Sequence, residues 1–299
     1  MTIVLAGGSG FLGGALHDHF TAAGHTVRTL TRHPRRGVAT DVHWHPDGHA
    51  GPWADTLADA DVVINLAGAG ISDKRWTESR KETLRTSRLQ PTRSLARGLA
   101  AAPPRPRTFV SGSAIGYYGP HGDEAVTEEF APGHDFLARL CLEWEGEAIA
   151  AVSPDTAVAI IRTGIVLHPE GGALKTMLLP FRMGVGGPMG SGRQFMSWIH
   201  LHDWVRLVAW LATSAPSGTS TVWNATAPSP VTNARFSKAL GRAVHRPAIV
   251  PVPGVALNVL LGEFATFLLA GARVLPAAAE RAGFTFEFPT LDGALDDLL

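Results

Sequence analysis

The first residues of the chain constrain its fold more than any other segment. A short apolar run, Thr2–Ala6, ends at a cluster of glycines, and residues 11–23 then show the apolar spacing of a helix up to Gly24. This pattern predicts a strand, a tight turn and a helix. Two overlapping glycine motifs occupy the turn: G-x-G-x-x-G at Gly8, Gly10 and Gly13, and G-x-x-G-x-x-G at Gly7, Gly10 and Gly13.

Glycines in such a turn have a chemical use. They bring backbone N–H groups close to a pyrophosphate and let the helix pack against the strand, while the positive end of the helix favours the anion. Because the motif lies between a strand and a helix, we prefer a dinucleotide site to a tight turn without a ligand. The predicted contacts in the turn are Gly7, Gly10, Phe11, Leu12 and Gly13.

Further apolar runs alternate with helical stretches, which is typical of a parallel sheet covered on both faces. The sequence therefore predicts an α/β fold: a Rossmann-like, doubly wound parallel sheet with a small, mostly helical C-terminal subdomain. The other expected strands are Val27–Thr31, Asp61–Leu66, Thr108–Ser111, Val158–Arg162 and Thr221–Asn224, and helices are expected at Glu78–Ala101 and at Trp204–Thr213, the latter capped by Asp203.

The end of the second strand should select the cofactor. An NAD site uses a carboxylate about 20 residues beyond the glycines, whereas an NADP site uses a cation for the 2′-phosphate. Residues 28–36 contain Arg28, Arg32, Arg35 and Arg36 and no acid. NADP(H) is therefore the predicted cofactor, with contacts from Thr31 and Arg32, and a solvated basic loop is the alternative. One well-placed Arg–phosphate pair would favour NADP(H) by about tenfold or more.

Composition limits the partners and the compartment. Lys plus Arg and Asp plus Glu both total 26, so no net positive field favours nucleic acid or an anionic membrane. The single cysteine, Cys141, excludes an intramolecular disulfide, and the cytoplasm is expected. The apolar stretch Val255–Leu275 carries Asn258, Glu263 and Arg273, which predicts a core or interface helix pair and no membrane span.

The chain is long enough for two folding units. Glycines between Gly171 and Gly192 exclude one continuous helix there and indicate a functional loop, and prolines from Pro247 to Pro253 mark a boundary. We expect an NADP-binding Rossmann-like domain over residues 1–245, with a substrate loop at about 164–200, and a small C-terminal domain over 246–299. Within that loop, residues 184–197, with Arg193, Gln194 and Trp198 interleaved, form either a lid over substrate or a crossover between subdomains.

Two strand ends carry motifs that resemble a known superfamily. Asn65-Leu-Ala-Gly68 is similar to the N-A-G element, and Ser111–Gly119 to the S-S-x-x-V-Y-G segment, of the short-chain dehydrogenase/reductase superfamily, extended or atypical branch. The resemblance implies cofactor contacts at Leu66, Ala67, Gly68 and Ser111. More narrowly, the chain resembles the "epimerase family protein" group through Arg75-Trp76, Ser87-Arg88, Gly116–Gly119, Asp135–Leu137, Trp144-Glu145, Gly186–Pro188 and Trp198–His200 with Asp203.

Catalysis in that superfamily needs a Tyr-x-x-x-Lys pair, in which one helical turn places an ammonium beside the phenol and the ribose. The only tyrosines here are Tyr117 and Tyr118, and neither has a lysine four residues later. Aligning the helix through Glu145 puts Leu137 at the tyrosine position and Cys141 at the lysine position. Leucine cannot transfer a proton and cysteine cannot supply a fixed positive charge, so the proton relay is altered; Leu137 remains a predicted cofactor contact.

Three residues remain as catalytic candidates. Ser113 matches the superfamily serine that hydrogen-bonds the substrate oxygen. Tyr117 and Tyr118 follow it and are interpreted either as a relocated acid/base or, preferably, as walls of the substrate pocket, since a tyrosine without an adjacent lysine keeps a pKa near about 10. Arg88 is expected to pair either with a cofactor phosphate or with a surface acid.

Two classes of function stay open. The leading hypothesis is NADP(H)-dependent hydride transfer on a small carbonyl or hydroxyl substrate, with a sugar-nucleotide epimerase as a related alternative. The second is a sensor or regulatory protein whose NADPH-bound surface a partner recognises. A homodimer is possible through residues 255–269. The pairs His43/His45 and His200/His202, each predicted to share a strand face, lack a third ligand, so no metal is expected.

Overall fold

The computed structural model describes residues 1–105, 107–214 and 218–299, without the side chain of Leu260. A seven-stranded parallel sheet runs in the order β3-β2-β1-β4-β5-β7-β11 and confirms the predicted α/β fold. Its strands are β1 (Thr2–Ala6), β2 (Thr26–Thr31), β3 (Asp41–His43), β4 (Val62–Asn65), β5 (Arg107–Ala114), β7 (Thr156–Thr163) and β11 (Ser220–Ala225).

The strand order changes direction at β1. From β1 the chain moves outward to β2 and β3, and then returns to place β4 on the other side of β1. In a doubly wound sheet, ligands bind at this switch point, outside the carboxyl ends of the strands. The glycine turn directly follows β1 and therefore lies at that point.

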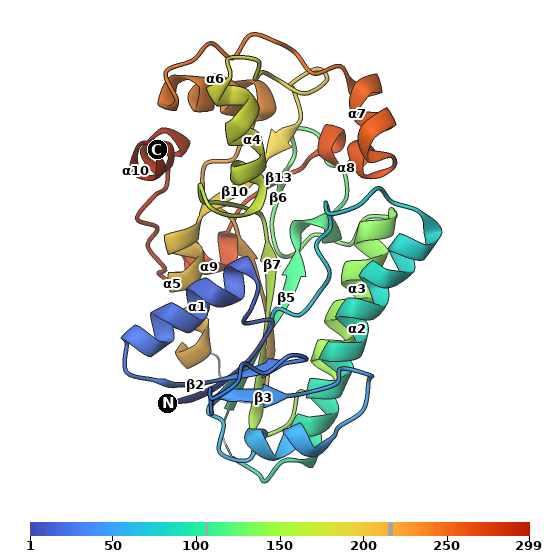
Figure 1. Ribbon diagram of the computed structural model, residues 1–299, viewed down its shortest axis with the longest axis vertical. Coiled ribbons are helices and arrows are strands. Elements are labelled where there is room, and N and C mark those ends of the chain that lie inside the picture. The colour runs from blue at the N-terminus through green and yellow to red at the C-terminus, as the bar shows by residue number, and fades with distance from the viewer. Residues whose placement is uncertain (106, 215–217) are drawn as a thin grey trace.

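Helices cover both faces of the sheet (Figure 1). One face packs α1 (Phe11–Ala22) and α5 (Leu201–Ser214) against a buried apolar layer that includes Ile3 and Leu5. The other face packs α2 (Glu78–Ala101) and α3 (Phe136–Ile149), and its layer includes Val4. Successive β1 residues point to opposite faces, which is why the strand is apolar throughout.

A second lobe stands above the carboxyl ends of the strands (Figure 1). Its core joins α4 (Gly172–Arg182), α6 (Asn233–Ala243) and α10 (Leu291–Leu298), which contribute Leu178, Phe236 and Leu295. This core draws on residues from both sides of the expected boundary at 245/246, so that division stays a prediction. As predicted, the segment Gly171–Gly192 is not one continuous helix, but it is not irregular throughout, because its first part forms α4, an amphipathic helix of eleven residues.

The remaining elements are short. The small strands pair as β8 (Ile165–Leu167) with β10 (Trp198–His200), β9 (Phe195–Met196) with β12 (Val231–Thr232), and β6 (Ala125–Val126) with β13 (Arg273–Val274). The other helices are η1 (Pro52–Leu57), η2 (Ile115–Tyr117), α7 (Gly254–Leu261), α8 (Phe264–Ala270) and α9 (Ala277–Arg281). Across the described ranges, no helix is long and apolar enough to cross a membrane.

Two local predictions were wrong. Asp203 does not cap its helix but lies inside α5, where its carboxylate accepts the backbone N–H groups of Glu287 and Phe288 at 2.9 and 2.8 Å and so ties down the C-terminal segment. His200 ends β10 whereas His202 belongs to α5, so they do not share a strand face. Within the part of the chain that is described, no group of three or more His, Cys, Asp or Glu could hold a metal ion.

Candidate functional site

The glycine turn after β1 leaves no room for side chains. Gly7 has a left-handed φ of +85°, and a Cβ there would lie 2.7 Å from the carbonyl carbon of Leu66. A Cβ on Gly13 would overlap the Gly7 carbonyl oxygen and lie 2.8 Å from the Cα of Gly8. Gly10 caps α1 without a side-chain hydrogen bond, and its own N–H donates to the Gly7 carbonyl at 3.0 Å. The first N–H groups of the helix, from Phe11 to Gly13, are therefore without a side-chain cap. This geometry suits a bound anion.

The two apolar residues of the turn have different surroundings. The Phe11 ring reaches the second lobe, where a Cβ on Gly172 would lie 3.3 Å from it and the His168 ring lies 5.9 Å away. Leu12 packs against the apolar layer below α1. The Phe11 ring therefore lies between the glycine turn and the second lobe, whereas the Leu12 side chain belongs to the apolar layer of the sheet.

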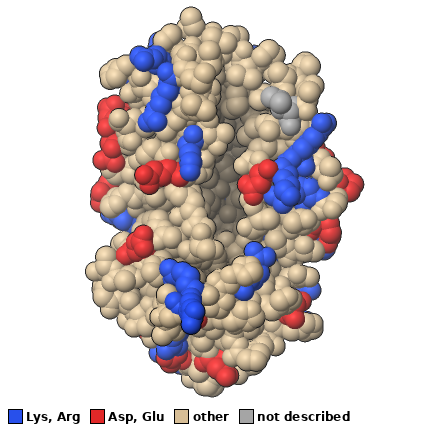
Figure 2. Space-filling view, viewed as in Figure 1, with Lys and Arg blue, Asp and Glu red and all other residues tan. Residues whose placement is uncertain are grey.

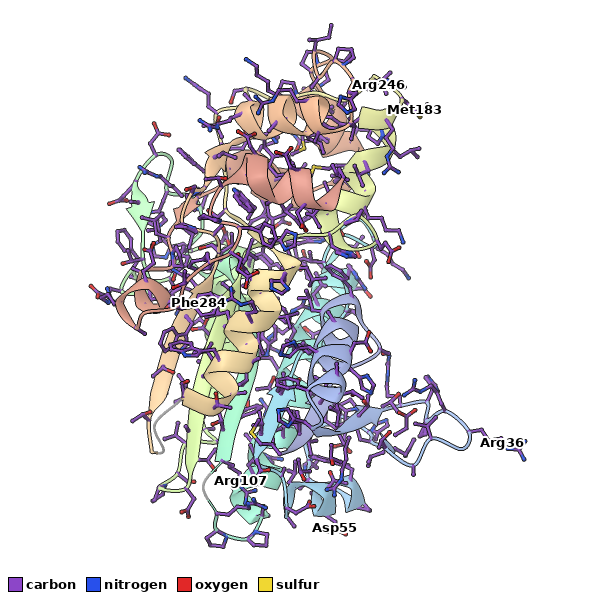
Figure 3. The ribbon with its side chains drawn as sticks, turned by 90° about the vertical axis from the view of Figure 1, so that its left-hand side faces the viewer. Arg36, Asp55, Arg107, Met183, Arg246 and Phe284 are labelled. Atoms are coloured by element: carbon purple, nitrogen blue, oxygen red, sulfur yellow. The ribbon has the colours of Figure 1, made fainter. Side chains whose placement is uncertain are left out.

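The structure separates the four arginines near the end of β2. Arg28 pairs with Asp59 at 2.5 Å, and Arg35 forms a bidentate pair with Asp41, whose pKa falls to about 2 because of that hydrogen bond. Arg36 points away from the body of the molecule (Figure 3). Arg32 is exposed directly after β2, and no acidic partner for it is found in the described residues. Thr31 ends the strand, and its hydroxyl accepts the N–H of His33.

Buried polar contacts hold the loop after β4. The Asn65 side chain donates to the Thr92 hydroxyl at 2.8 Å and accepts the N–H of Ala67 at 3.1 Å. Leu66 donates its N–H to the Ala6 carbonyl at 2.9 Å, which joins the loop to β1. The backbone of Leu66, Ala67 and Gly68 is thereby fixed beside the glycine turn, as the predicted cofactor contacts require.

Arg88 lies beneath this loop. Its side chain packs on Gly68, where a Cβ would come within 3.3 Å of it, and its guanidinium lies 5.3 Å from the centre of the Trp144 ring. It donates to the Leu84 carbonyl of its own helix at 3.1 Å. Burial lowers the pKa of Arg88. The expected alternative of a surface ion pair finds no support among the described residues, because none of their carboxylates lies within ion-pair distance of it.

A buried ion pair lies beneath the end of β5. Arg162, on β7, donates to both carboxylate oxygens of Glu145, on α3, at 2.8 Å each. The Ser113 hydroxyl donates to the same carboxylate at 2.6 Å. Although burial opposes its charge, the contact with Glu145 raises the pKa of Arg162. The only hydroxyl proton of Ser113 is thus committed to Glu145, and its oxygen keeps only acceptor capacity for a ligand.

Both tyrosines pack against the same guanidinium. Arg162 donates to the Tyr118 hydroxyl at 2.9 Å, and that hydroxyl donates to the side-chain oxygen of Asn224 at 2.7 Å. The Arg162 guanidinium carbon lies 3.3 Å from the centre of the Tyr117 ring. Burial raises the pKa of Tyr118 to about 12, above the value expected from the sequence, which disfavours it as an acid/base near neutral pH. That Tyr117 lines a substrate pocket stays a prediction.

The positions of Leu137 and Cys141 are apolar and closed. Leu137 is buried and packs against Gly116, near Phe267 of α8. The Cys141 thiol is buried beside the carbonyl oxygen of Ala114, and burial raises its pKa to about 12. Neither residue can exchange a proton at neutral pH.

A hollow runs down the middle of the face seen in Figure 2, with charged side chains mainly at its rim. The carboxyl ends of the parallel strands point towards it (Figure 1). Ser111 lies inside β5, level with Asn65 at the end of β4, and has a buried hydroxyl without a hydrogen-bond partner among the described residues. Such an orphan hydroxyl fits a bound polar ligand. By contrast, Gln194 and Trp198 are buried in the second lobe, so of the three residues assigned to a lid only Arg193 is exposed.

Sequence reasoning missed the partners of the ion pair. Glu145 was named from the sequence as part of a family motif and as the point through which the helix was aligned. Arg162 and Asn224 were named only as the ends of predicted strands, and none of the three was assigned a role in the site. A charged residue that ends a fully apolar strand is the available signal, because such a charge needs a buried partner.

These features together define a dinucleotide-binding α/β protein. The model of the NAD dependent epimerase/dehydratase family matches residues 3–225, and the model of a domain of unknown function matches residues 252–298. The chain belongs to this epimerase/dehydratase family, and the predicted superfamily is confirmed. An epimerase family protein of Mycobacterium bovis is 43% identical over 295 residues, which are 98% of this chain and 96% of that protein.

Two solved structures are similar over the whole chain. The structure of human epimerase family protein SDR39U1 with NADPH has 33% identity and a TM-score of 0.88, and 99% of it is covered. A nucleoside-diphosphate sugar epimerase from Corynebacterium glutamicum has 32% identity and a TM-score of 0.81, with 58% of its length covered.

Proposed function

We propose that this chain binds NADP(H) and transfers hydride between the nicotinamide and a small carbonyl or hydroxyl substrate. The observation that carries the proposal is the glycine turn, in which a Cβ at Gly7 or Gly13 would clash with the backbone, together with Arg32 after the neighbouring strand, for which the described residues offer no acidic partner. The human relative crystallised with NADPH supports the choice of cofactor. Bound there, NADPH would supply the hydride.

Each part of the cofactor has candidate partners in this chain. The pyrophosphate would be held by backbone N–H groups of Phe11–Gly13, because the N–H of Gly10 donates to the Gly7 carbonyl within the turn. The 2′-phosphate would be held by Thr31 and Arg32, and the rest of the cofactor by residues 66–68, Arg88, Ser111 and Leu137. Ser113 would contact the substrate as a hydrogen-bond acceptor, because its proton is held by Glu145. A substrate hydroxyl satisfies that acceptor better than a carbonyl does.

A cofactor titration tests the proposal. We expect the wild-type chain to bind NADPH about tenfold or more tightly than NADH, and Arg32→Ala to remove that preference. Arg35→Ala removes the same charge from an arginine already paired with Asp41, and it should leave the preference intact. Equal wild-type affinities for NADPH and NADH, measured by fluorescence titration, would contradict the 2′-phosphate site.

The second candidate is an NADPH-dependent sensor or regulatory protein. The observation in its favour is that the Ser113 hydroxyl donates its proton to Glu145 and the Tyr118 hydroxyl donates its proton to Asn224. Both hydroxyl protons are therefore used inside the protein, and Ser113 keeps only acceptor capacity. A panel of carbonyl and sugar-nucleotide substrates, followed by NADPH absorbance, separates the candidates. Turnover above the cofactor-only rate supports the enzyme, whereas tight NADPH binding without turnover supports the sensor.

Three broader parts of the proposal are independent of the site. A single buried thiol is compatible with a cytoplasmic location. Val255 and Val259 are exposed on α7, and they are the residues through which a homodimer would form. Residues 1–245 and 246–299 are proposed as the two folding units.

A further inference from the structure

Arg88 is charged, half-buried and largely unused by the protein. A guanidinium has five N–H donors, and the hydrogen bond to Leu84 accounts for one of them in the described residues. Arg85, one turn earlier on α2, shows the contrast, since it pairs with Glu143 at 2.7 Å. A desolvated guanidinium without an anionic partner is costly, so Arg88 is placed for a ligand.

The order of the strands indicates which part of a dinucleotide lies near Arg88. The glycine turn follows β1, and Arg32 follows β2 on one side of it. If the 2′-phosphate lies beyond β2 and the pyrophosphate beyond β1, the other half of the cofactor extends over β4 and β5, on the opposite side. Arg88 packs on the loop after β4 and on Trp144 of α3, the helix that follows β5.

We propose that Arg88 binds the hydroxyls of the nicotinamide ribose, and that it supplies from α2 the fixed positive charge that Cys141 cannot supply from α3. This inference rests on the proposed NADP(H) function. The orphan hydroxyl of Ser111, on β5 level with the end of β4, offers a second hydrogen-bonding group on the same side of the turn.

Arg88 and the Cys141 position lie within electrostatic reach of each other. Burial raises the pKa of the Cys141 thiol, and the positive charge of Arg88 acts in the opposite direction on that same thiol. The charge therefore reaches the surroundings of the missing lysine even though it comes from a different helix. Gly68 makes this possible, because a side chain there would press on the Arg88 guanidinium.

A series of three ligands locates the contact. The ligands are 2′-phosphoadenosine 5′-diphosphate, 2′-phospho-ADP-ribose, which adds the ribose, and NADPH, which adds the nicotinamide. We expect Arg88→Met in the full chain to weaken 2′-phospho-ADP-ribose and NADPH by about tenfold or more while leaving the first ligand unchanged. Arg88→Lys should show a smaller loss confined to the same two ligands. Arg85→Met on the same helix should change none of the three.

Each other outcome has a distinct meaning. An equal loss for all three ligands would overturn the ribose assignment and place Arg88 on a phosphate. No loss for any ligand with Arg88→Met would exclude contact with the cofactor. If Arg88→Met does not fold, Arg88→Lys alone decides between these outcomes by the same comparison. If the wild-type chain binds none of the ligands, the proposed function itself fails, which the wild-type titration shows separately.

Discussion

The glycine turn after β1 and the network beneath β5 lie at the same edge of the sheet but use their polar groups in opposite ways. The turn leaves backbone N–H groups without side-chain caps, and Arg32 beside it has no acidic partner among the described residues. In the network, Glu145 accepts three hydrogen bonds, and Arg162 donates to both Glu145 and Tyr118. The first region is prepared for a ligand, whereas the second is stabilised by its own contacts.

This contrast implies that a cofactor site can keep its phosphate-binding turn while the side chains of its proton relay change. A phosphate-binding turn depends on backbone geometry, which few substitutions preserve. A proton relay depends on side chains, and these can be exchanged when a buried polar group finds a new partner. The altered relay and the intact turn are therefore compatible within one fold.

The largest expected effect comes from breaking the buried network beneath β5. Glu145→Gln leaves the Arg162 guanidinium buried without its counter-charge, and we expect a loss of about 3–5 kcal/mol in the free energy of unfolding. Urea denaturation measures it. Glu143→Gln on the same helix breaks an exposed pair with Arg85 and should cost less than about 1 kcal/mol. Similar losses for both variants would mean that the buried ion pair contributes no more to the free energy of unfolding than the exposed pair does.

The same variant sharpens the comparison. We expect folded Glu145→Gln to bind 2′-phosphoadenosine 5′-diphosphate as tightly as the wild-type chain does, because that ligand reaches only the turn and Arg32. A loss of affinity for this ligand would show that the buried network and the glycine turn are coupled.

The next effect concerns the glycine turn after β1. Gly13→Ala places a Cβ against the Gly7 carbonyl oxygen and distorts the turn, and we expect NADPH affinity to fall by about hundredfold, or about 2.7 kcal/mol. Gly14→Ala is the control, because its nearest atom would be 4.0 Å away, and alanine favours the helix. Calorimetric titration of both variants measures the difference. Equal affinities would contradict a tightly packed phosphate turn.

The smallest effect is a pH dependence. Because burial raises the pKa of Tyr118 to about 12, the phenol stays neutral in the folded chain when an exposed tyrosine ionises near about 10. Stability from this group is fully present below pH of about 10 and is lost as the pH rises towards about 12. Ultraviolet titration of Tyr117→Phe should show no phenolate at pH of about 10.5. Ionisation with an ordinary midpoint would show that the network is open to water.

Prediction from sequence succeeded where the signal is local. The helix over Glu78–Ala101 has the predicted bounds, and α1 ends one residue before the predicted end. The strand, glycine turn and helix at the start lie where the motif put them, since apolar period and glycine position act over a few residues. The arginines at the end of β2 led to the prediction of a 2′-phosphate site at Thr31 and Arg32, which stays a prediction. The structure adds that Arg28 and Arg35 are paired with acids.

Prediction failed where partners are distant along the chain. Asp203 matches a helix cap by sequence, but it binds backbone groups more than eighty residues away. Glu145 and Arg162 are 17 residues apart on a helix and a strand, and only the packing of α3 on β7 joins them. No periodicity reports such a pair. The position of Arg162 in an apolar strand indicates that it needs a buried partner, but the sequence does not show which acid that partner is.

By itself, the sequence determined the class of fold, the phosphate turn and the absence of a Tyr-x-x-x-Lys pair, since these depend on residue identity and short spacing. Only the tertiary structure decided that Arg28 and Arg35 are paired while Arg32 has no acidic partner in the described part of the chain. It also decided that the Ser113 hydroxyl donates to Glu145 and that Arg88 approaches the Cys141 position from another helix. The physical reason is that the availability of a polar group depends on which neighbours satisfy it, and folding brings those neighbours from distant parts of the chain.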